Sequence, residues 1–269
     1  VIADFDITES MLRHFIEKVT GHSFMIRPRI MVCIPSCITM VEQRAIQEAA
    51  EQAGARSTYL IEEPLAAAMG AGLDISEPYG SMVVDIGGGT TDVAVISLGG
   101  IVISDSLRVA GDKFDEAIMD YIKKEFNLMI GERTAENIKM EVGAAFPEAR
   151  HSKMNIRGRD LLTGLPKNIE VTTEQVSKAL ESSVVQIVDC VKEVLEKCPP
   201  ELASDIMDHG IILTGGGAML YGLDELIRKE TQISTSLAED PLSCVALGTG
   251  RALENIDKLD SKKSIAFWK

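Results

Sequence analysis

The chain has 269 residues, of which 45% are hydrophobic and 25% are charged, and its formal net charge is −14. This composition is typical of a soluble globular protein with one large or two moderate domains, and it excludes a disordered chain. Because so acidic a surface repels nucleic-acid phosphates and no basic run offsets it, we expect no nucleic acid among the partners.

The five cysteines are an odd number without a CxxC pair, and the residues carry no signal-peptide pattern. We therefore expect free thiols in a reducing cytoplasm. Cys33 and Cys37 flank a strand end, but no histidine follows at metal-ligand spacing, which favours packed thiols over a metal pair. No apolar stretch approaches the length of a membrane span.

Apolar spacing and helix-end signals divide the first seventy residues into alternating helices and strands. Thr39 and Glu42 form a capping box at the start of one helix, which ends before Gly54, and Pro64 suits the first position of another. Pro35 closes a short apolar strand that precedes the capping box. These signals predict helices over residues 6–19, 40–53 and 65–70, and strands over residues 29–34 and 58–61.

The rest of the chain continues this alternation. Apolar runs separated by glycines predict a three-stranded meander, which is followed by a helix, a charged region ending at Lys167, a long helix and two strand–helix pairs. The meander covers residues 82–86, 92–97 and 101–107, the helices cover 113–126 and 173–197, and the pairs cover 211–230 and 233–254. Strands interleaved with helices predict an α/β protein.

A glycine cluster, DIGGGTTD at residues 85–92, joins the first two strands of the meander. Glycines lack a Cβ, so their N–H groups can turn toward an anion at positive φ, and the threonines add hydroxyl donors. Asp85, at the end of the strand, is placed to hold a magnesium ion through water or to orient an attacking water. The alternative is a glycine-rich turn that binds nothing. The candidate phosphate contacts are Gly87, Gly88, Gly89 and Thr90.

A second cluster, TGGGAM at residues 214–219, has the same arrangement. The apolar strand from Ile211 to Leu213 runs into three glycines, and apolar residues at helical spacing follow. Two strands that each end in a glycine loop indicate two loops closing on one nucleotide, whereas two unrelated turns are the alternative.

At these motifs the chain resembles a known family. Asp-Ile-Gly-Gly-Gly-Thr-Thr-Asp resembles the second phosphate loop of the superfamily of actin, heat-shock chaperones and sugar kinases, and Thr-Gly-Gly-Gly-Ala resembles its adenosine loop. The segments at 34–55, 59–73, 108–139, 157–167 and 199–220 resemble MreB, the bacterial actin of cell shape, and its Mbl-like paralogues. The resemblance covers nearly the whole chain, and the block from Gly131 to Lys139 is specific to this branch.

The resemblance implies an α/β, actin-like ATPase fold, with ribonuclease-H-like units in two domains around a nucleotide cleft. Residues 1–75 would form the remainder of the first domain (IA), and residues 76–251 the second (IIA), with a smaller subdomain (IIB) at about 112–178. Residues 252–269 would return to the first domain. The family's first phosphate loop, an Asp-x-Gly-Thr hairpin, does not occur in these residues, so we expect the first domain to be incomplete.

Glu62 and Glu63 precede Pro64, where a strand passes into a helix N-terminus. A glutamate there can orient or deprotonate a water that attacks a γ-phosphate, or it can be first-turn charge favoured by the helix dipole. In the family, the segment IEEP carries the hydrolytic glutamate. The resemblance therefore implies Glu63 as the catalytic residue, with Glu62 as second choice, and Thr90 and Asp85 as residues that hold the water.

Glu136 and Lys139 lie at i and i+3 on one helical face, which by itself indicates a surface ion pair. The resemblance implies that this segment approaches the ribose and adenine from the smaller subdomain, while the second glycine loop lines the opposite side. Met219 would pack on the purine. The nucleotide contacts implied in this way are Glu136, Asn137, Ile138, Lys139, Gly215, Gly216, Gly217, Ala218 and Met219.

Three apolar residues, Phe24, Met25 and Ile26, lie in a loop flanked by Arg27 and Arg29. Because loops run over the surface, the triplet either packs under its own loop or contacts a partner, and the arginines suit anionic lipid headgroups. MreB proteins carry a membrane-insertion loop at this place. The resemblance therefore implies contact with the anionic inner membrane.

Taken together, the resemblance implies a filament-forming cytoskeletal protein that binds ATP and magnesium, hydrolyses ATP slowly and lies in the cytoplasm at the inner membrane. Its expected partners are other copies of itself, the membrane surface, and cell-wall synthesis and shape proteins. The alternatives are a sugar kinase or a chaperone-type ATPase of the same superfamily. A kinase needs a substrate pocket and a chaperone a peptide-binding β domain, and the sequence shows an insertion for neither.

Overall fold

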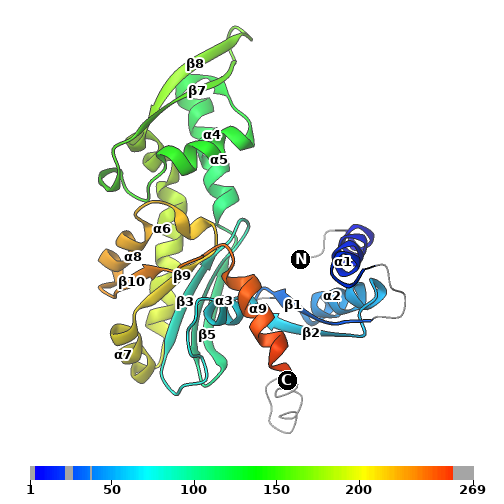
Figure 1. The fold of residues 1–269 in the computed structure, drawn as a ribbon. Coiled ribbons are helices and arrows are strands. Elements are labelled where there is room, and N and C mark those ends of the chain that lie inside the picture. Colours follow the sequence, from blue (N-terminus) through cyan, green and yellow to red (C-terminus); the bar gives the residue numbers. More distant parts are fainter. Residues whose placement is uncertain (1–3, 22–26, 37, 257–269) are drawn as a thin grey trace. The chain divides into compact units, whose positions relative to one another are not determined.

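The computed structural model describes residues 4–21, 27–36 and 38–256. The described chain divides into two compact units: the part up to Asp74 together with the part from Ser243 onward, and residues 75–242 (Figure 1). The return to the first unit begins at Ser243, earlier than the predicted residue 252, because the helix after Ser243 packs on a helix of the first unit.

The first unit contains a two-stranded parallel sheet. Its elements are α1 (Phe5–Thr20), β1 (Arg29–Ile34), α2 (Met40–Gln52), β2 (Ser57–Glu62), α3 (Glu63–Gly70) and α9 (Cys244–Glu254). The predicted capping box is confirmed, since the N–H of Glu42 donates to the Thr39 hydroxyl at 3.2 Å and the N–H of Thr39 donates to the Glu42 carboxylate at 2.8 Å. Each of these elements lies close to its predicted bounds.

Helices α3 and α9 pack with their backbones in close contact. A Cβ on Gly70 would lie 1.7 Å from the carbonyl oxygen of Cys244, and a Cβ on Gly248 would lie 1.8 Å from that of Ala66. Glycine is therefore required at both positions, because any side chain would push the helices apart. This contact holds α3, which follows directly from β2 and begins at Glu63.

The second unit is built on a five-stranded sheet with the order β10-β9-β3-β4-β5. The strands are β3 (Ser81–Ile86), β4 (Thr91–Ser97), β5 (Gly100–Leu107), β9 (Ile211–Thr214) and β10 (Thr235–Leu237). β3, β4 and β5 form the predicted antiparallel meander, whereas β9 is parallel to both β3 and β10. Both β3 and β4 are almost entirely buried, which explains their near-continuous apolar sequences.

Helices and a smaller antiparallel sheet complete this unit (Figure 1). The helices are α4 (Gly111–Phe126), α5 (Glu132–Val142), α6 (Thr173–Lys197), α7 (Pro200–His209) and α8 (Leu223–Thr231), with short 3₁₀ turns at Pro147–Ala149 and Gly217–Met219. The smaller sheet has the order β6-β7-β8, from Leu128–Met129, Lys153–Asp160 and Pro166–Thr172. Two elements were not predicted: the β7–β8 hairpin, most of which lies in the charged region before Lys167, and α7, which lies in the connection after the long helix.

One apolar core joins these layers. It contains the inward residues of β3 and β4 together with those of α4, α5 and α6, including Phe114 and Leu180, which are fully buried. α6 packs on β4 and β5, and α4 packs on both α5 and α6. The loops at the ends of β3 and β9 are thus carried by a rigid, densely packed body.

Candidate functional site

The first glycine loop joins β3 to β4 as a short turn. The N–H of Gly87 donates a 2.9 Å hydrogen bond to the carbonyl of Thr90. Gly88 and Gly89 are exposed, and the hydroxyl of Thr90 makes no hydrogen bond within the described chain. The tip of the loop therefore offers backbone and hydroxyl groups to solvent.

None of these three glycines has a positive φ, so the expectation that they turn toward an anion in that conformation is wrong. A Cβ on Gly88 would lie 3.3 Å from a carboxylate oxygen of Asp112, whereas a Cβ on Gly89 would meet nothing within 4 Å. The missing side chain therefore leaves open space at Gly89, and in none of the three glycines does it relieve backbone strain.

The second glycine loop leaves the sheet beside the first. β9 is parallel to β3, and Thr214 pairs with Asp85, so both strands end at the same edge. Gly215 has a φ of 82°, and a Cβ there would lie 2.3 Å from the carbonyl oxygen of Ile86. A Cβ on Gly217 would lie 2.5 Å from Cγ2 of Ile86. The structure thus brings the two predicted loops together, and the second requires glycine because it packs on the backbone of the first.

Asp85 lies at this junction and is only 7% exposed. The hydroxyl of Thr214 donates a 3.0 Å hydrogen bond to its carboxylate. Burial raises the pKa of Asp85 to about 6. The hydrogen bond from the Thr214 hydroxyl opposes this rise in pKa, whereas the carboxylate of Asp92, which pairs with Asp85 from β4, adds to it. An approaching cation would reverse this effect and hold Asp85 ionised.

Magnesium usually keeps several waters and takes one or two protein carboxylates together with phosphate oxygens. Asp85 supplies one such carboxylate where the two loops meet. In the described parts of the chain, no group of three or more His, Cys, Asp or Glu side chains is arranged to hold a metal by itself. The residues therefore fit a magnesium ion that shares its ligands with bound phosphates.

The first loop is also tied to the start of α4. The N–H of Gly111 donates to the carbonyl of Gly87 at 3.1 Å, and the N–H of Asp112 donates to the carbonyl of Gly88 at 2.8 Å. Neither Gly111 nor Asp112 was predicted as part of the site. The signal that could have found them was a glycine two residues before the helix predicted at 113–126.

The predicted contacts on α5 have different surroundings. Ile138 is fully buried in the core, Asn137 is half-buried and Glu136 is exposed. Lys139 forms its ion pair with Asp115 of α4, at 2.9 Å, instead of with Glu136. The side chain of Ile138 therefore serves packing, and Asp115 is a residue of this region that the sequence analysis missed.

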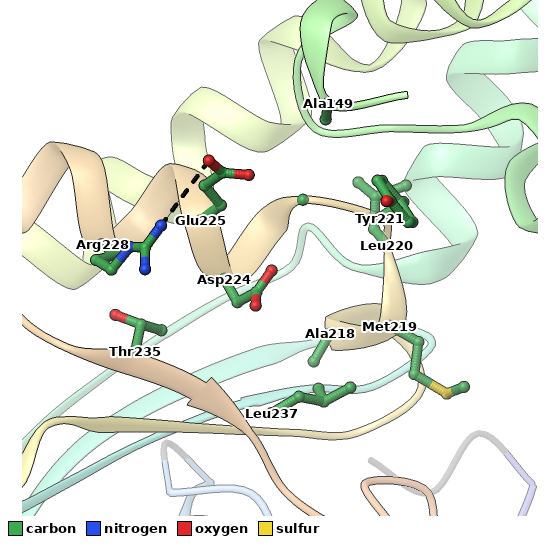
Figure 2. A pocket seen from close by; sticks show the side chains of 11 residues that line it. Ala149, Ala218, Met219, Leu220, Tyr221, Asp224, Glu225, Arg228, Thr235 and Leu237 are labelled. Carbon is green, nitrogen blue, oxygen red and sulfur yellow. Dashed lines mark ion pairs between the residues drawn. The ribbon is translucent and has the colours of Figure 1, made fainter. Parts of the chain in front are cut away.

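Beyond the second loop lies a cavity of about 470 Å³ (Figure 2). Ala218 and Met219 line it, and the side chain of Asp224 faces into it beside the 3.8 Å ion pair of Glu225 and Arg228. None of the predicted contacts on α5 is among its lining residues. The cavity therefore lies beside the second loop and does not unite the two predicted sides of the nucleotide.

Glu62 and Glu63 belong to the first unit, at the N-terminus of α3. Glu62 is the last residue of β2 and the N-cap, and burial raises its pKa. Glu63 is the first helical residue and Pro64 the second, so the helix begins one residue before Pro64, the predicted first position. Both residues are half-buried, so they combine partial access to water with a fixed backbone.

Phe24, Met25 and Ile26, the predicted membrane contact, lie outside the described residues. Among the helices that the structure describes, none is both long and apolar enough to cross a membrane.

Comparison with known proteins shows which family the chain resembles in sequence and structure. Residues 1–261 match the family described as MreB/Mbl protein. The chain is 55% identical over 263 residues to the cell shape-determining protein Mbl of Bacillus subtilis (strain 168). This match spans 98% of the present chain and 79% of Mbl. The crystal structure of MreB5 of Spiroplasma citri bound to ADP matches with a TM-score of 0.92 and 39% identity, over 97% of this chain and 78% of that one.

Two further structures match. MreB5 bound to AMPPNP has a TM-score of 0.92 and 38% identity, over 97% of this chain and 79% of that one. The MamK double helical filament has a TM-score of 0.79 and 20% identity, over 94% of this chain and 77% of that one, which shows a likeness of fold alone.

These similarities confirm the resemblance in the glycine loops and the predicted α/β, actin-like fold. They also set aside the sugar kinases and chaperone ATPases that share the superfamily. The chain belongs to the MreB/Mbl family of bacterial actin homologues.

Proposed function

We propose that the chain binds the adenine nucleotides ATP and ADP, with the phosphates at the first glycine loop and the adenosine at the second. The observation that carries this proposal is the hydrogen bond between Thr214 and Asp85, which joins the two loops at one edge of the sheet. Exposed backbone at Gly88 and Gly89 and the open space over Gly89 suit a phosphate group. MreB5, which is 39% identical, is bound to ADP in one structure and to AMPPNP in another.

Magnesium would enter with the nucleotide and neutralise phosphate charge. Asp85 would hold it through water, and the hydroxyl of Thr90 would help to orient a water near the terminal phosphate. Gly216, Ala218 and Met219, in the second glycine loop, would contact the adenosine.

Slow ATP hydrolysis is the proposed reaction, with Glu63 orienting the attacking water and Glu62 as the second candidate. The place of Glu63 at a helix N-terminus supports this role, because β2 and the α3–α9 contact hold its backbone. Hydrolysis would time the life of a polymer rather than serve metabolism.

Assembly into filaments and a role in cell shape complete the proposal. Mbl, at 55% identity, is a cell shape-determining protein, and the fold matches that of the subunit of a MamK filament. We therefore propose copies of this chain as its first partners, with wall-synthesis and shape proteins as further partners in the cytoplasm.

The proposed filament would lie at the inner membrane, with Phe24, Met25 and Ile26 contacting anionic lipid. Burying such a side chain contributes about 1.5 to 3 kcal/mol, which is little for one subunit but large when many subunits share one filament. Replacing all three residues by serine should abolish sedimentation of filaments with anionic vesicles and leave polymer formation intact. Unchanged vesicle binding would contradict this part of the proposal.

Titration calorimetry with ATP and ADP tests nucleotide binding directly. Gly89→Asp is the informative variant, because its Cβ meets nothing within 4 Å and its carboxylate would repel phosphate. Repulsion of about 3 kcal/mol between the new carboxylate and the phosphates would lower the affinity for both nucleotides by about two orders of magnitude. Gly131→Asp, the same change at another open and exposed glycine, is the control and should bind normally.

Absence of binding by the unsubstituted chain would contradict the proposal, as would equal binding by Gly89→Asp. Thermal unfolding of both variants shows whether they fold like the unsubstituted chain.

A further inference from the structure

Residues 143–152, which follow α5, form a segment that we call the strap, and it packs on the chain just beyond the second glycine loop. The N–H of Ala145 in the strap donates a 2.9 Å hydrogen bond to the carbonyl of Tyr221. Gly222 has a φ of 77°, and a Cβ there would lie 2.8 Å from the Cβ of Ala149. Ala149 and Tyr221 line the same cavity (Figure 2). Gly222 therefore lets the chain after the loop lie directly against the strap.

Arg150 is the strap residue that contacts both α5 and Tyr221. Its Nη1 donates a 3.2 Å hydrogen bond to the carbonyl of Met140 in the last turn of α5, and its Cζ lies 5.4 Å from the centroid of the Tyr221 ring. The last carbonyls of a helix have no partner within the helix, so a cation there supplies a donor and interacts favourably with the helix dipole. A guanidinium over an aromatic face is attracted to it as well. One cation thus joins the end of α5 to the chain after the second loop.

The two ends of the second loop are held differently. At its start, the N–H of Gly215 donates to the carbonyl of Pro241 at 2.9 Å, and the loop packs on the backbone of the first loop. At its end, Leu220 is buried in the core, whereas Met219 and Tyr221 on either side of it are 54% and 53% exposed. The orientation of Tyr221 therefore depends on its contacts with the strap.

We propose that Arg150 is a positioning residue for the adenosine. It holds the end of the second glycine loop against α5, and so it fixes the part of the loop that would contact the nucleoside. Gly216, Ala218 and Met219 are the proposed contacts, and Tyr221 follows Met219 by two residues. The effect on binding rests on the proposed function, whereas the link between α5, the strap and the loop in the free protein does not.

Hydrogen exchange in the ligand-free chain is the first test. Arg150→Met removes the cation and keeps the apolar stem. We expect the amide of Ala145, which donates to Tyr221, to exchange at least about fivefold faster, while the amide of Val93 in the buried strand β4 stays unchanged. The matched control is Arg157→Met, the same change at an exposed arginine of β7, which should alter neither amide.

Unchanged exchange at Ala145 in a folded Arg150→Met protein would overturn the proposal. If that variant does not fold, Arg150→Gln replaces it, because the new amide group can still donate to the carbonyl of Met140 while the cation over the ring is lost. Faster exchange at Ala145 is again expected in Arg150→Gln, and normal exchange there would equally overturn the proposal.

Rescue by lysine separates the cation from the bulk of the side chain. Arg150→Lys keeps a positive charge that can donate to the helix end and lie over the ring, so exchange at Ala145 should return to within about twofold of the unsubstituted chain. Exchange as fast as in Arg150→Met would show that the charge does not hold the loop, and would contradict the proposal.

Ligand affinity is the second test, measured by titration calorimetry with adenosine and with ADP. Arg150→Met should weaken both ligands by the same factor, about fivefold, because the nucleoside is the part that they share. Arg150→Lys should bind both within about twofold of the unsubstituted chain. A loss confined to ADP would place the defect at the phosphates and overturn the proposal.

A double-mutant cycle shows whether Arg150 acts through Tyr221. Tyr221→Leu removes the ring and should weaken adenosine about threefold, whereas Tyr221→Phe keeps a ring and should bind normally. The double variant Arg150→Met with Tyr221→Leu should lose about fivefold, as Arg150→Met does alone, instead of the roughly fifteenfold of two independent losses. Losses that multiply in full would overturn the coupling.

Failure of the proposed function is distinguishable from failure of this proposal. If the unsubstituted chain binds neither adenosine nor ADP, the proposed nucleotide function is wrong, while exchange at Ala145 still decides whether Arg150 holds the loop.

Discussion

The hydroxyl of Thr214 donates a 3.0 Å hydrogen bond to the carboxylate of Asp85, which joins two positions 129 residues apart in the chain. Thr214 ends β9 and Asp85 lies next to the end of β3, and each is followed by a glycine loop. The bond is buried, so the two loops share one fixed point at the edge of the sheet. The candidate phosphate site is organised around this pair.

Burial of Asp85 should make stability depend on pH. The folded pKa, about 6, lies above the ordinary aspartate pKa of 3.8, so the folded chain binds this proton more tightly than the unfolded chain. The resulting stabilisation is full below about pH 4 and is lost as pH rises through about 6. Asp85→Asn should therefore raise the free energy of unfolding by about 3 kcal/mol above pH 7, but by only about 1 kcal/mol at pH 4.5.

Urea unfolding of ligand-free protein at the two pH values measures this difference. A gain that stays constant between them would show that Asp85 has an ordinary pKa. Because the gain would come with loss of the proposed magnesium ligand, the same variant should bind ATP more weakly in the presence of magnesium.

Gly215→Ala should destabilise the chain by about 2 to 4 kcal/mol. Its φ of 82° disfavours a side chain, and the added Cβ would lie 2.3 Å from the carbonyl oxygen of Ile86. Gly89→Ala is the matched control in the other loop, where a Cβ meets nothing within 4 Å, and should change stability by no more than about 0.5 kcal/mol. Equal denaturation midpoints for the two variants would refute the packing of one loop on the other.

Two glycines on α9 should respond in opposite directions. Gly248→Ala should destabilise by about 2 to 4 kcal/mol, because its Cβ would lie 1.8 Å from the carbonyl oxygen of Ala66 in α3. Gly250 is exposed with open space around it, so Gly250→Ala should stabilise by about 0.5 to 1 kcal/mol through helix propensity. Chemical denaturation of the two variants checks the sign, and destabilisation by Gly250→Ala would contradict this account of α9.

The proposed catalytic glutamate can be separated from its neighbour. Glu63→Gln should lower phosphate release from ATP by about two to four orders of magnitude and leave ADP affinity nearly unchanged. Glu62→Gln, the same change one residue away, should have a small effect. Turnover that is lost only in Glu62→Gln would move the assignment to Glu62, and unchanged turnover in both would remove α3 from the mechanism.

Much of the fold could be predicted from the sequence because its signals are local. The strand Arg29–Ile34 and the helix Thr173–Lys197 have the predicted bounds, and both hydrogen bonds of the Thr39–Glu42 capping box are present. The spacing of apolar residues, the helix-capping residues, and the glycines and prolines that end an element all lie within the element or a few residues from it. The two glycine loops were recognised for the same reason.

The β7–β8 hairpin was missed because its sequence is largely polar. In β7 only Ile156 and Asp160 are buried, and Asp160 is held by backbone N–H groups of Leu162 and Thr163 and by Lys167. Apolar alternation is too weak there to indicate a strand. The hairpin depends on pairing with its neighbours and packing on the helices beside it.

The sequence by itself determined the family, the order of the elements and the two loops on which a nucleotide would bind. The tertiary structure decided which residues meet: Thr214 with Asp85, and Lys139 with Asp115 instead of Glu136. It also showed that none of the glycines of the first loop has a positive φ and that Gly89 leaves open space. Such pairings depend on how distant segments pack into one core, and no local pattern of residues specifies that packing.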